Sequence, residues 1–469
     1  MSHISSQPGF QSITQSRSRR LWIKNPLAIY TANNEDARGG VVIENDRIVE
    51  LVPNGATPTL SYDSSFDAAK HVVMPGLINT HHHLYQTLTR ALPAALNKPL
   101  FPWLKALYPV WARLQPDMLA SATTLGLAEL LLSGCTTVSD HHYLYPDALT
   151  EAMDIQVDAA TKMGARVMLT RGSMSLGEKD GGLPPQQTVQ TDEQILADCE
   201  RVIKRYHDRR EGAMIQIALA PCSPFSVTTE LMQATAKLAS TYNVRLHTHL
   251  AETNDENDFC IEKFSLRPLD YLESVGWLNE HVWLAHGIHF SASEIRRLGK
   301  ARVGIAHCPT SNMILSSGIC QTLALERAGA HVGLAVDGSA SNDGSNMIQE
   351  VRQALLLNRL QYPADEISHL DVLRWATSGS AAVLGRDDIG ALAVGKQADI
   401  ALFKLDDCRF SGSHDPLAAT ILCGAHHADA VMVAGVWRVQ SGEIVNPSLD
   451  LARLRQQHQE HAYALAAKA

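Results

Sequence analysis

The sequence has few features of a secreted, membrane-bound or nucleic-acid-binding protein. Its eight cysteines include no C-x-x-C pair, which argues against a zinc finger and favours reduced thiols in a cytoplasmic protein. Lys and Arg total 40 against 49 Asp and Glu, and the net charge of −9 argues against a nucleic-acid partner. Apolar runs end well short of the ~18 residues that a membrane span needs. The sequence therefore favours a protein that works on small molecules.

The first 20 residues are polar and contain no apolar stretch typical of a secretory signal. We expect residues 1–20 to form a loose, disordered tail. A transit peptide is the alternative interpretation, because this segment is rich in Ser and Arg and has no acidic residue.

Between residues 72 and 338, short apolar runs alternate with longer segments of helical spacing. Near-continuous apolarity is typical of parallel strands that are buried on both faces. Eight such strands alternating with helices favour an α/β fold, a (β/α)8 TIM-like barrel, over an open sheet. The predicted strands are VVMPGLIN (72–79), CTTVSD (135–140), ARVMLTR (165–171), MIQIALAP (214–221), VRLHTHL (244–250), HVWLAH (281–286), RVGIAH (302–307) and HVGLAVD (331–337).

The two ends of the chain have a different pattern. Residues 21–71 and 386–447 contain short alternating strands separated by Gly, Asn and Asp turns. We expect them to form one small β-sandwich domain beside the barrel, which would occupy residues 72–385. The last segment, 448–469, predicts a surface helix.

Histidine is frequent, at 21 of 469 residues, and several of the predicted strands end in it. Barrel enzymes build their active sites from the carboxyl ends of their strands. Polar residues therefore gather where a site is expected. They are His81, His83, Asp140, His141, Arg171, Cys222, His249, Glu252, His286, His307 and Asp337.

The motif N-T-H-H-H places His81 and His83 on one side of an extended segment, because alternate residues point the same way. In H-T-H-L-A-E, we expect His249 to reach the same site and His247, which lies deeper, to be a hydrogen-bonded core residue. Asp337 ends the eighth run. Each motif alone has a structural alternative, a chance histidine cluster or an aspartate that caps a turn or a helix.

Together, three imidazoles and one carboxylate form a plausible ligand set for zinc, or for another divalent ion such as iron. Such an ion lowers the pKa of a water molecule that it binds toward neutrality. Glu252, His286 and Asp337 are then the candidates for moving protons around that water. The combined pattern predicts a metal-dependent hydrolase.

Several motifs in the chain resemble the amidohydrolase superfamily. More narrowly, they are similar to its aminohydrolase branch of methylthioadenosine and adenosylhomocysteine deaminases, guanine deaminases and triazine hydrolases. The resemblance covers roughly residues 21–445. The motifs are PGLINTHHH (75–83), LHTHLAET (246–253), LAHGIH (284–289), HCPTSNMILSSG (307–318), VDGSASND (336–343) and GALAVGKQADIALF (390–403).

This resemblance implies roles for individual residues. Glu252 would carry a proton from the attacking water to a ring nitrogen, His286 would orient that water, and Asp337 would pass a proton to the leaving amine. Superfamily members with two metals bridge them through a modified lysine, which the third and fourth predicted strands lack. The resemblance therefore implies one divalent metal, with zinc expected and Fe²⁺ as the alternative. Its ligands would be His81, His83, His249 and Asp337.

Residues 81–93 and 101–111 look most like bacterial 8-oxoguanine deaminases, which implies conversion of 8-oxoguanine and water to urate and ammonia in purine metabolism. Gln86 matches the H-x-H-x-x-Q pattern of guanine deaminases. Cys222 stands where guanine deaminases carry arginine and adenosylhomocysteine deaminases histidine, so the ring is expected to be bound differently. The expected substrate contacts are Gln86, Arg90, Trp103, Tyr143 and Cys222; packing or ion pairing is the alternative for Arg90, Trp103 and Tyr143.

Other functions remain open at this point. An isoxanthopterin or guanine deaminase and an aminotriazine or chlorotriazine hydrolase would share the same site. A non-catalytic zinc-binding scaffold is disfavoured by Glu252, because a proton carrier has no use in binding alone. The resemblance also implies a homo-oligomer. His141, His142, His289 and His307 have no assigned role and are interpreted as core or pocket groups.

Overall fold

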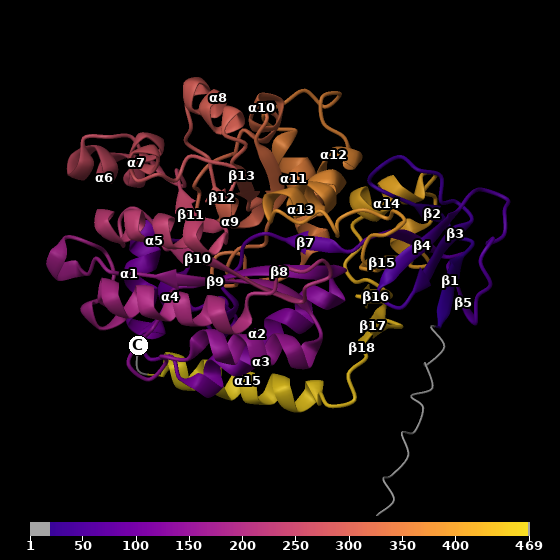
Figure 1. The fold of residues 1–469 in the computed structure, drawn as a ribbon, viewed down its shortest axis with the longest axis horizontal. Coiled ribbons are helices and arrows are strands. Elements are labelled where there is room, and N and C mark those ends of the chain that lie inside the picture. The colour runs from indigo at the N-terminus through magenta and orange to yellow at the C-terminus, as the bar shows by residue number, and fades with distance from the viewer. Residues whose placement is uncertain (1–18, 468–469) are drawn as a thin grey trace, which may run out of the picture.

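The computed structural model describes residues 19–467, and at its centre is an eight-stranded parallel sheet surrounded by helices (Figure 1). The strands pair in chain order from first to last. They are β7 (Leu77–Asn79), β8 (Cys135–His142), β9 (Arg166–Ser173), β10 (Ile215–Pro221), β11 (Leu246–Leu250), β12 (Val282–His286), β13 (Gly304–His307) and β14 (His331–Leu334).

The sheet closes into a barrel between β7 and β14. The Thr80 N–H donates to the Leu334 carbonyl at 3.1 Å, and the Val336 N–H donates to the Asn79 side-chain oxygen at 3.0 Å. Inside the barrel, Trp283 is fully buried and its indole N–H donates to the Thr80 carbonyl at 3.1 Å. The predicted (β/α)8 barrel is confirmed.

Several of the helices that cover the barrel begin at a residue whose side chain caps them. Thr191 and Gln194 form a capping box at the start of one helix, and Ser291 and Glu294 form another. The helices of this layer are α2 (Pro116–Leu132), α3 (Ala152–Met163), α4 (Asp192–Tyr206), α5 (Thr229–Tyr242), α6 (Asn254–Phe264), α7 (Pro268–Ser274), α8 (Ala292–Lys300), α9 (Pro309–Ile314), α10 (Thr322–Ala328), α11 (Met347–Asn358), α12 (His369–Arg374) and α13 (Ser380–Val383).

Residues 72–79, predicted as one barrel strand, belong to two different sheets. Strand β6 (His71–Pro75) pairs with strands of the small domain, and only β7 enters the barrel. The chain passes from one sheet to the other at Gly76. A Cβ atom there would lie 2.2 Å from the Thr136 side chain, so this crossing requires glycine. The other seven predicted runs each overlap one barrel strand.

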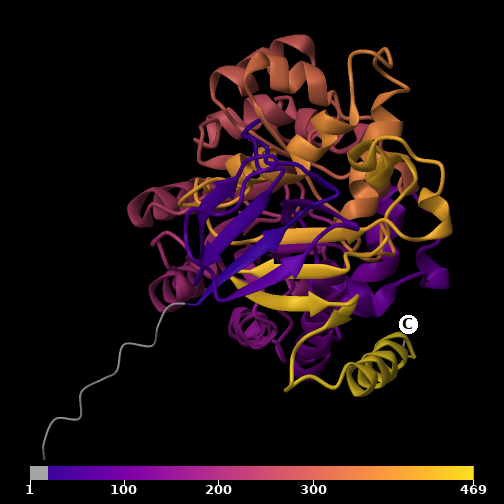
Figure 2. The ribbon, with the colours of Figure 1, turned by 90° about the vertical axis from the view of Figure 1, so that its right-hand side faces the viewer.

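Segments from both ends of the chain build the small domain, as predicted. Figure 2 views this end of the molecule, where the indigo N-terminal strands lie against the orange and yellow C-terminal strands. The facing side chains of the two sheets share one buried apolar cluster that includes Ile23, Val41, Val73 and Leu402. The first sheet contains β1 (Arg20–Lys24), β3 (Gly40–Glu44), β4 (Arg47–Val52) and β5 (Ser64–Asp67); the second contains β2 (Ala28–Ile29), β6, β15 (Ile400–Lys404), β16 (Ala430–Val433), β17 (Val436–Gln440) and β18 (Glu443–Ile444).

A buried ion pair joins the barrel to the small domain. The guanidinium of Arg166, at the start of β9, makes two hydrogen bonds to the carboxylate of Asp399, at 2.8 and 3.0 Å. Asp399 also accepts the Ala434 N–H at 2.7 Å. Bidentate geometry and a further donor satisfy the buried charges, so neither is left unpaired where the barrel meets the small domain.

The last helix, α15 (Leu451–Ala466), runs back from the small domain along α2 (Figure 1). Its inner face is buried at Leu454, His458 and Leu465. Helix α14 (Pro416–Leu422) lies beside α11.

Up to position 18, the predicted N-terminal tail lies outside the described residues. Its last residue, Arg20, already belongs to β1. Each helix within residues 19–467 is too short or too polar to cross a membrane.

Candidate metal and active site

Three imidazoles and one carboxylate from distant parts of the chain meet at the carboxyl end of the barrel. His81 and His83 follow β7, His249 lies on β11 and Asp337 follows β14. The Nε2 atoms of His83 and His249 are 3.2 Å apart. The Asp337 carboxylate lies 3.2 Å from His81 Nε2 and 3.5 Å from His83 Nε2. The four predicted metal ligands are thus placed together.

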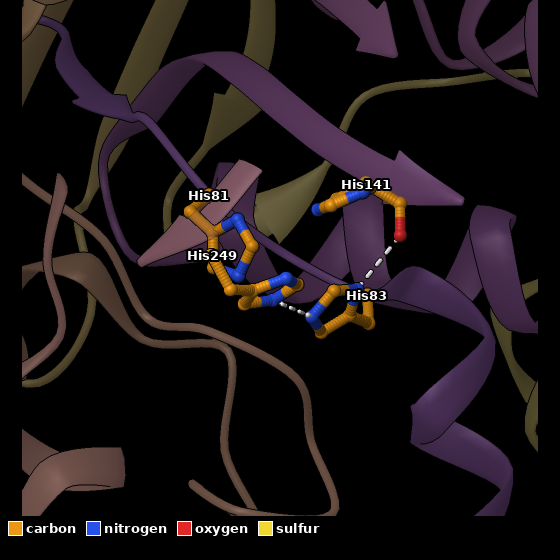
Figure 3. Close-up of side chains that lie close together, drawn as sticks. All are labelled: His81, His83, His141 and His249. Carbon is orange, nitrogen blue, oxygen red and sulfur yellow. Dashed lines mark hydrogen bonds between the residues drawn. The ribbon is translucent and has the colours of Figure 1, made fainter. Parts of the chain in front are cut away.

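Hydrogen bonds fix which nitrogen of each imidazole carries its proton. His83 Nδ1 lies 2.7 Å from the His141 carbonyl (Figure 3). His249 Nδ1 lies 2.6 Å from the Cys222 carbonyl. A carbonyl oxygen can only accept, so both Nδ1 atoms are protonated and both Nε2 atoms present lone pairs. Two lone pairs that face each other repel, unless a cation lies between them.

A second histidine, His247, sets which nitrogen of His81 carries its proton. The His247 Nδ1–H donates to the Trp283 carbonyl at 2.9 Å, which leaves His247 Nε2 as an acceptor for the His81 Nδ1–H at 2.7 Å. The Nε2 atom of His81 is buried and has no hydrogen-bond partner among the described residues. The third imidazole therefore also presents a lone pair toward the carboxylate of Asp337.

This donor set fits a divalent metal ion. Zinc bonds nitrogen at about 2.0–2.1 Å, which places neighbouring tetrahedral ligands about 3.4 Å apart. The separations of 3.2 and 3.5 Å match that value. Burial lowers the pKa of His249 to about 3 and the pKa of His81 well below its ordinary value, so the imidazoles stay neutral and able to ligate.

A fourth imidazole, His141 on β8, lies beside these ligands. Figure 3 shows it next to His83 and His249, and its ring stacks on that of His249 with centroids 4.8 Å apart. Its Nε2–H donates to the Ala220 carbonyl at 2.9 Å, while its buried Nδ1 has no hydrogen-bond partner in the described chain. His141 therefore forms one wall of the cluster.

The other unassigned histidines bond within the structure. His142 Nε2–H donates to the Leu144 carbonyl at 2.7 Å, and His289 Nε2–H donates to the Ser317 carbonyl at 2.9 Å. His307 Nε2 accepts from the Asn358 side-chain amide at 3.5 Å. These contacts hold loops and helices in place.

Two candidate proton carriers lie next to the cluster. His286 Nε2 is 3.4 Å from the Glu252 carboxylate and 3.9 Å from the Asp337 carboxylate. Burial raises the pKa of Glu252 to about 7, although the nearby His286 opposes that shift. Burial works to lower the pKa of His286, but the carboxylates of Glu252 and Asp337 raise it overall. Glu252 can therefore bind and release a proton near neutral pH.

The backbone is strained where these side chains are presented. Ala251, His286 and Asp337 follow or end barrel strands and have φ angles of 55°, 71° and 65°. This left-handed region costs a residue with a side chain about 1–3 kcal/mol. Strain at three strand ends in one site is typical of backbone that is bent to aim functional groups.

Supporting residues that the sequence analysis did not identify hold these groups. The Ser311 hydroxyl donates to Asp337 at 2.6 Å, and the His286 Nδ1–H donates to the Asn312 side-chain oxygen at 3.0 Å. The buried Glu256 carboxylate accepts the N–H groups of Ala251 and Glu252, at 2.9 and 3.0 Å. Ser311 and Asn312 lie on the short helix α9, which follows the carboxyl end of β13, so the rule that strand ends build the site could have identified them. Only the tertiary structure reveals Glu256.

A narrow pocket opens onto the cluster. Its lining combines the proton carriers and metal ligands with the apolar face of helix α1 (Leu100–Trp111), which contributes Leu100, Trp103, Leu104 and Tyr108. A largely apolar lining with a few convergent polar groups is typical of a site for a small molecule.

Four of the five predicted substrate contacts line this pocket: Gln86, Trp103, Tyr143 and Cys222. The fifth, Arg90, is not among the lining residues. Its guanidinium pairs with Glu129 on α2 and donates to the Ser339 hydroxyl at 3.4 Å. Arg90 therefore lies outside the pocket, where it pairs with a carboxylate, as in the alternative interpretation.

Several known proteins are similar to this chain in sequence or in fold. It is 64% identical over 448 residues to an 8-oxoguanine deaminase of Pseudomonas aeruginosa, covering 96% of this chain and 99% of that protein. It is 35% identical over 410 residues to an isoxanthopterin deaminase from an unknown prokaryotic organism, covering 83% and 85%. The structure of an atrazine chlorohydrolase from Arthrobacter aurescens complexed with zinc matches with a TM-score of 0.88 at 32% identity, covering 94% of this chain and all of that one.

The model of the amidohydrolase family matches residues 72–438, which span the barrel, its cluster of histidines and aspartate, and part of the small domain. Because that match covers well over half of the sequence, this chain belongs to the amidohydrolase family.

Proposed function

We propose that this protein hydrolyses 8-oxoguanine to urate and ammonia. The observation that carries the proposal is the arrangement of Glu252 beside a buried cluster of three imidazoles and a carboxylate, within a chain that is 64% identical to an 8-oxoguanine deaminase. A carboxylic acid with a pKa of about 7 beside a set of candidate metal ligands suits hydrolysis at neutral pH.

One divalent ion would be held by His81, His83, His249 and Asp337, and zinc is the ion we propose, with Fe²⁺ as the alternative. When bound, the ion would acidify a water molecule so that it attacks at neutral pH. No lysine occurs on β9 or β10 that could bridge a second ion, which favours a single metal.

The side chains around the cluster would move the protons. Glu252 would protonate the ring nitrogen next to the carbon that bears the amine, which relieves the charge that builds on the ring as the water oxygen bonds to that carbon. His286, held by Asn312, would orient the water with its Nε2 atom. Asp337 would take the second proton of the water and pass it to the amine, and the carbon–nitrogen bond then breaks to release ammonia.

The pocket would hold the purine between apolar surfaces. Trp103 would offer its ring face, since its indole N–H is already bonded to the Ala340 carbonyl at 3.1 Å. The Gln86 side-chain oxygen accepts the Ala340 N–H at 3.3 Å, and the Gln86 amide nitrogen donates to the Tyr85 hydroxyl at 3.5 Å. The second amide N–H would be the one that bonds a ring acceptor. Tyr143 and Cys222 would complete the wall, and burial raises the pKa of Cys222 to about 12, so its thiol stays neutral.

Ammonia release from a panel of heterocycles tests this proposal. We expect the highest kcat/KM for 8-oxoguanine and lower values for guanine, isoxanthopterin and aminotriazines. Preference for one of the others would refute the substrate, and no release from any of them by metal-loaded protein would refute the enzyme and favour a binding scaffold.

We further propose that the enzyme works in the cytoplasm as a homo-oligomer. All eight cysteines are free thiols, and six of them are buried, as expected for a reducing compartment. Light scattering of the purified protein measures its oligomeric state, and a monomeric mass would refute that part of the proposal.

A further inference from the structure

The pocket wall contains a buried hydroxyl without a partner. Tyr108, on α1, is 1% exposed and lines the pocket, and its hydroxyl oxygen makes no hydrogen bond to any described residue. It is the only buried side-chain nitrogen or oxygen on the described pocket lining that lacks a partner.

The other polar groups on this side of the pocket are already bonded. The Tyr143 hydroxyl bonds to that of Tyr85, and the Trp103 N–H bonds to a backbone carbonyl. Burying a hydroxyl without a partner costs free energy, because it loses its hydrogen bonds to water. A ligand that brings an acceptor to Tyr108 would recover that loss.

The protonation state of Tyr108 suits a donor. Burial raises its pKa well above the ordinary value, and the nearby Cys222, Tyr85 and Glu252 act in the same direction. The hydroxyl therefore keeps its proton, and a carbonyl oxygen is the complementary group on a heterocycle.

We propose that Tyr108 donates a hydrogen bond to the C8 carbonyl of the substrate and thereby selects 8-oxoguanine over guanine. This inference rests on the proposed function. The carbon that bears the amine must lie near Glu252, His286 and Asp337, which come from the strand ends. The five-membered ring, at the other end of the purine, then extends toward the side of the pocket that α1 builds.

Guanine has a C–H group where 8-oxoguanine has this carbonyl. Bound in the same pose, guanine leaves the Tyr108 hydroxyl unpaired, and an active site built to bond a polar group discriminates against an analogue that lacks it. The histidines and Asp337 cannot supply a preference for 8-oxoguanine over guanine, since they would act on the same amine in both purines. The contact with Tyr108 would supply it.

Tyr108→Phe tests the proposal, with Tyr145→Phe as the matched control. Tyr145 is also buried with an unpartnered hydroxyl, but it does not line the pocket and its ring contacts Arg171. We expect Y108F to lower kcat/KM for 8-oxoguanine about 10- to 100-fold and to leave kcat/KM for guanine within about twofold. Metal content should stay unchanged, and Y145F should leave the ratio of the two substrates unchanged.

The outcomes separate this inference from the proposed function. Equal losses on both substrates in Y108F, or no loss on either, would overturn the role of Tyr108 while the deaminase activity stands. A wild-type enzyme that is inactive on 8-oxoguanine would refute the proposed function and this inference with it.

Discussion

His81 donates its Nδ1–H to His247 Nε2 across 2.7 Å, deep in the barrel. His247 is held in turn by the Trp283 carbonyl at 2.9 Å, and its ring stacks on the Trp283 indole with centroids 4.4 Å apart. This chain of contacts sets the tautomer and the ring orientation of His81. Outer partners of this kind also raise the basicity of the histidine that ligates the metal.

Replacing His247 should therefore weaken metal binding without touching the ion directly. We expect His247→Phe to lower metal affinity about 10- to 100-fold. The His81 Nδ1–H then loses its acceptor, and the His81 ring is no longer held in one orientation. Competition with a chromogenic chelator measures this. The control is His142→Phe, which removes another buried histidine bonded to a carbonyl. Equal affinities in H247F and wild type would contradict the role of His247.

Glu252→Gln should separate catalysis from metal binding. The amide keeps the size of the side chain but cannot carry a proton, so we expect kcat to fall about 100- to 10,000-fold. Metal content by elemental analysis should match that of wild type, because Glu252 is placed beside the ligands and contacts His286 rather than the cluster. Loss of metal in E252Q would make Glu252 a ligand and refute its assignment as proton carrier.

Removing the metal should lower both activity and stability. Without a cation, the lone pairs of His83 and His249 face each other at 3.2 Å. We expect the chelated protein to lose activity and to unfold at a lower temperature. A metal whose free concentration is 1,000 times its Kd stabilises the folded protein by about 4 kcal/mol. Thermal scans with added Zn²⁺, Fe²⁺ or Mn²⁺ identify the ion that restores both properties, and an unchanged Tm after complete metal removal would contradict the site.

Lowering the pH should reduce the stability of the fold, because His458 on α15 becomes protonated. Its Nε2–H donates at 3.0 Å to Thr87, in the turn η1 (Leu84–Thr89) that carries Gln86. Burial lowers the pKa of His458 to about 4, with Arg90 and His461 acting in the same direction. The unfolded chain therefore binds this proton first, and stability is lost as pH falls from about 6.5 toward 4.

We expect wild type to lose about 1–2 kcal/mol more than His458→Gln between pH 7 and pH 5, measured by urea unfolding. Glutamine retains an N–H donor for Thr87 but does not titrate. His414→Gln, at an exposed histidine, is the control and should behave as wild type. An identical acid response in H458Q would show that another group is responsible.

The sequence by itself determined the barrel and the four side chains that meet at its carboxyl end. Parallel strands that are buried on both faces are mainly apolar, so their near-continuous apolar runs revealed them. Their carboxyl ends share one edge of the barrel. His81, His83, His249 and Asp337 could therefore be predicted to meet from their places at the ends of three strands.

Only the tertiary structure decided which neighbours these groups have. The change of sheet at Gly76, the pairing of Arg90 with Glu129, the bond from His81 to His247 and the unpartnered hydroxyl of Tyr108 all depend on how segments far apart in the chain pack together. Local patterns report which face of an element is buried. They cannot report what covers that face, because the partner is set by side-chain volume and hydrogen-bond geometry across the whole fold.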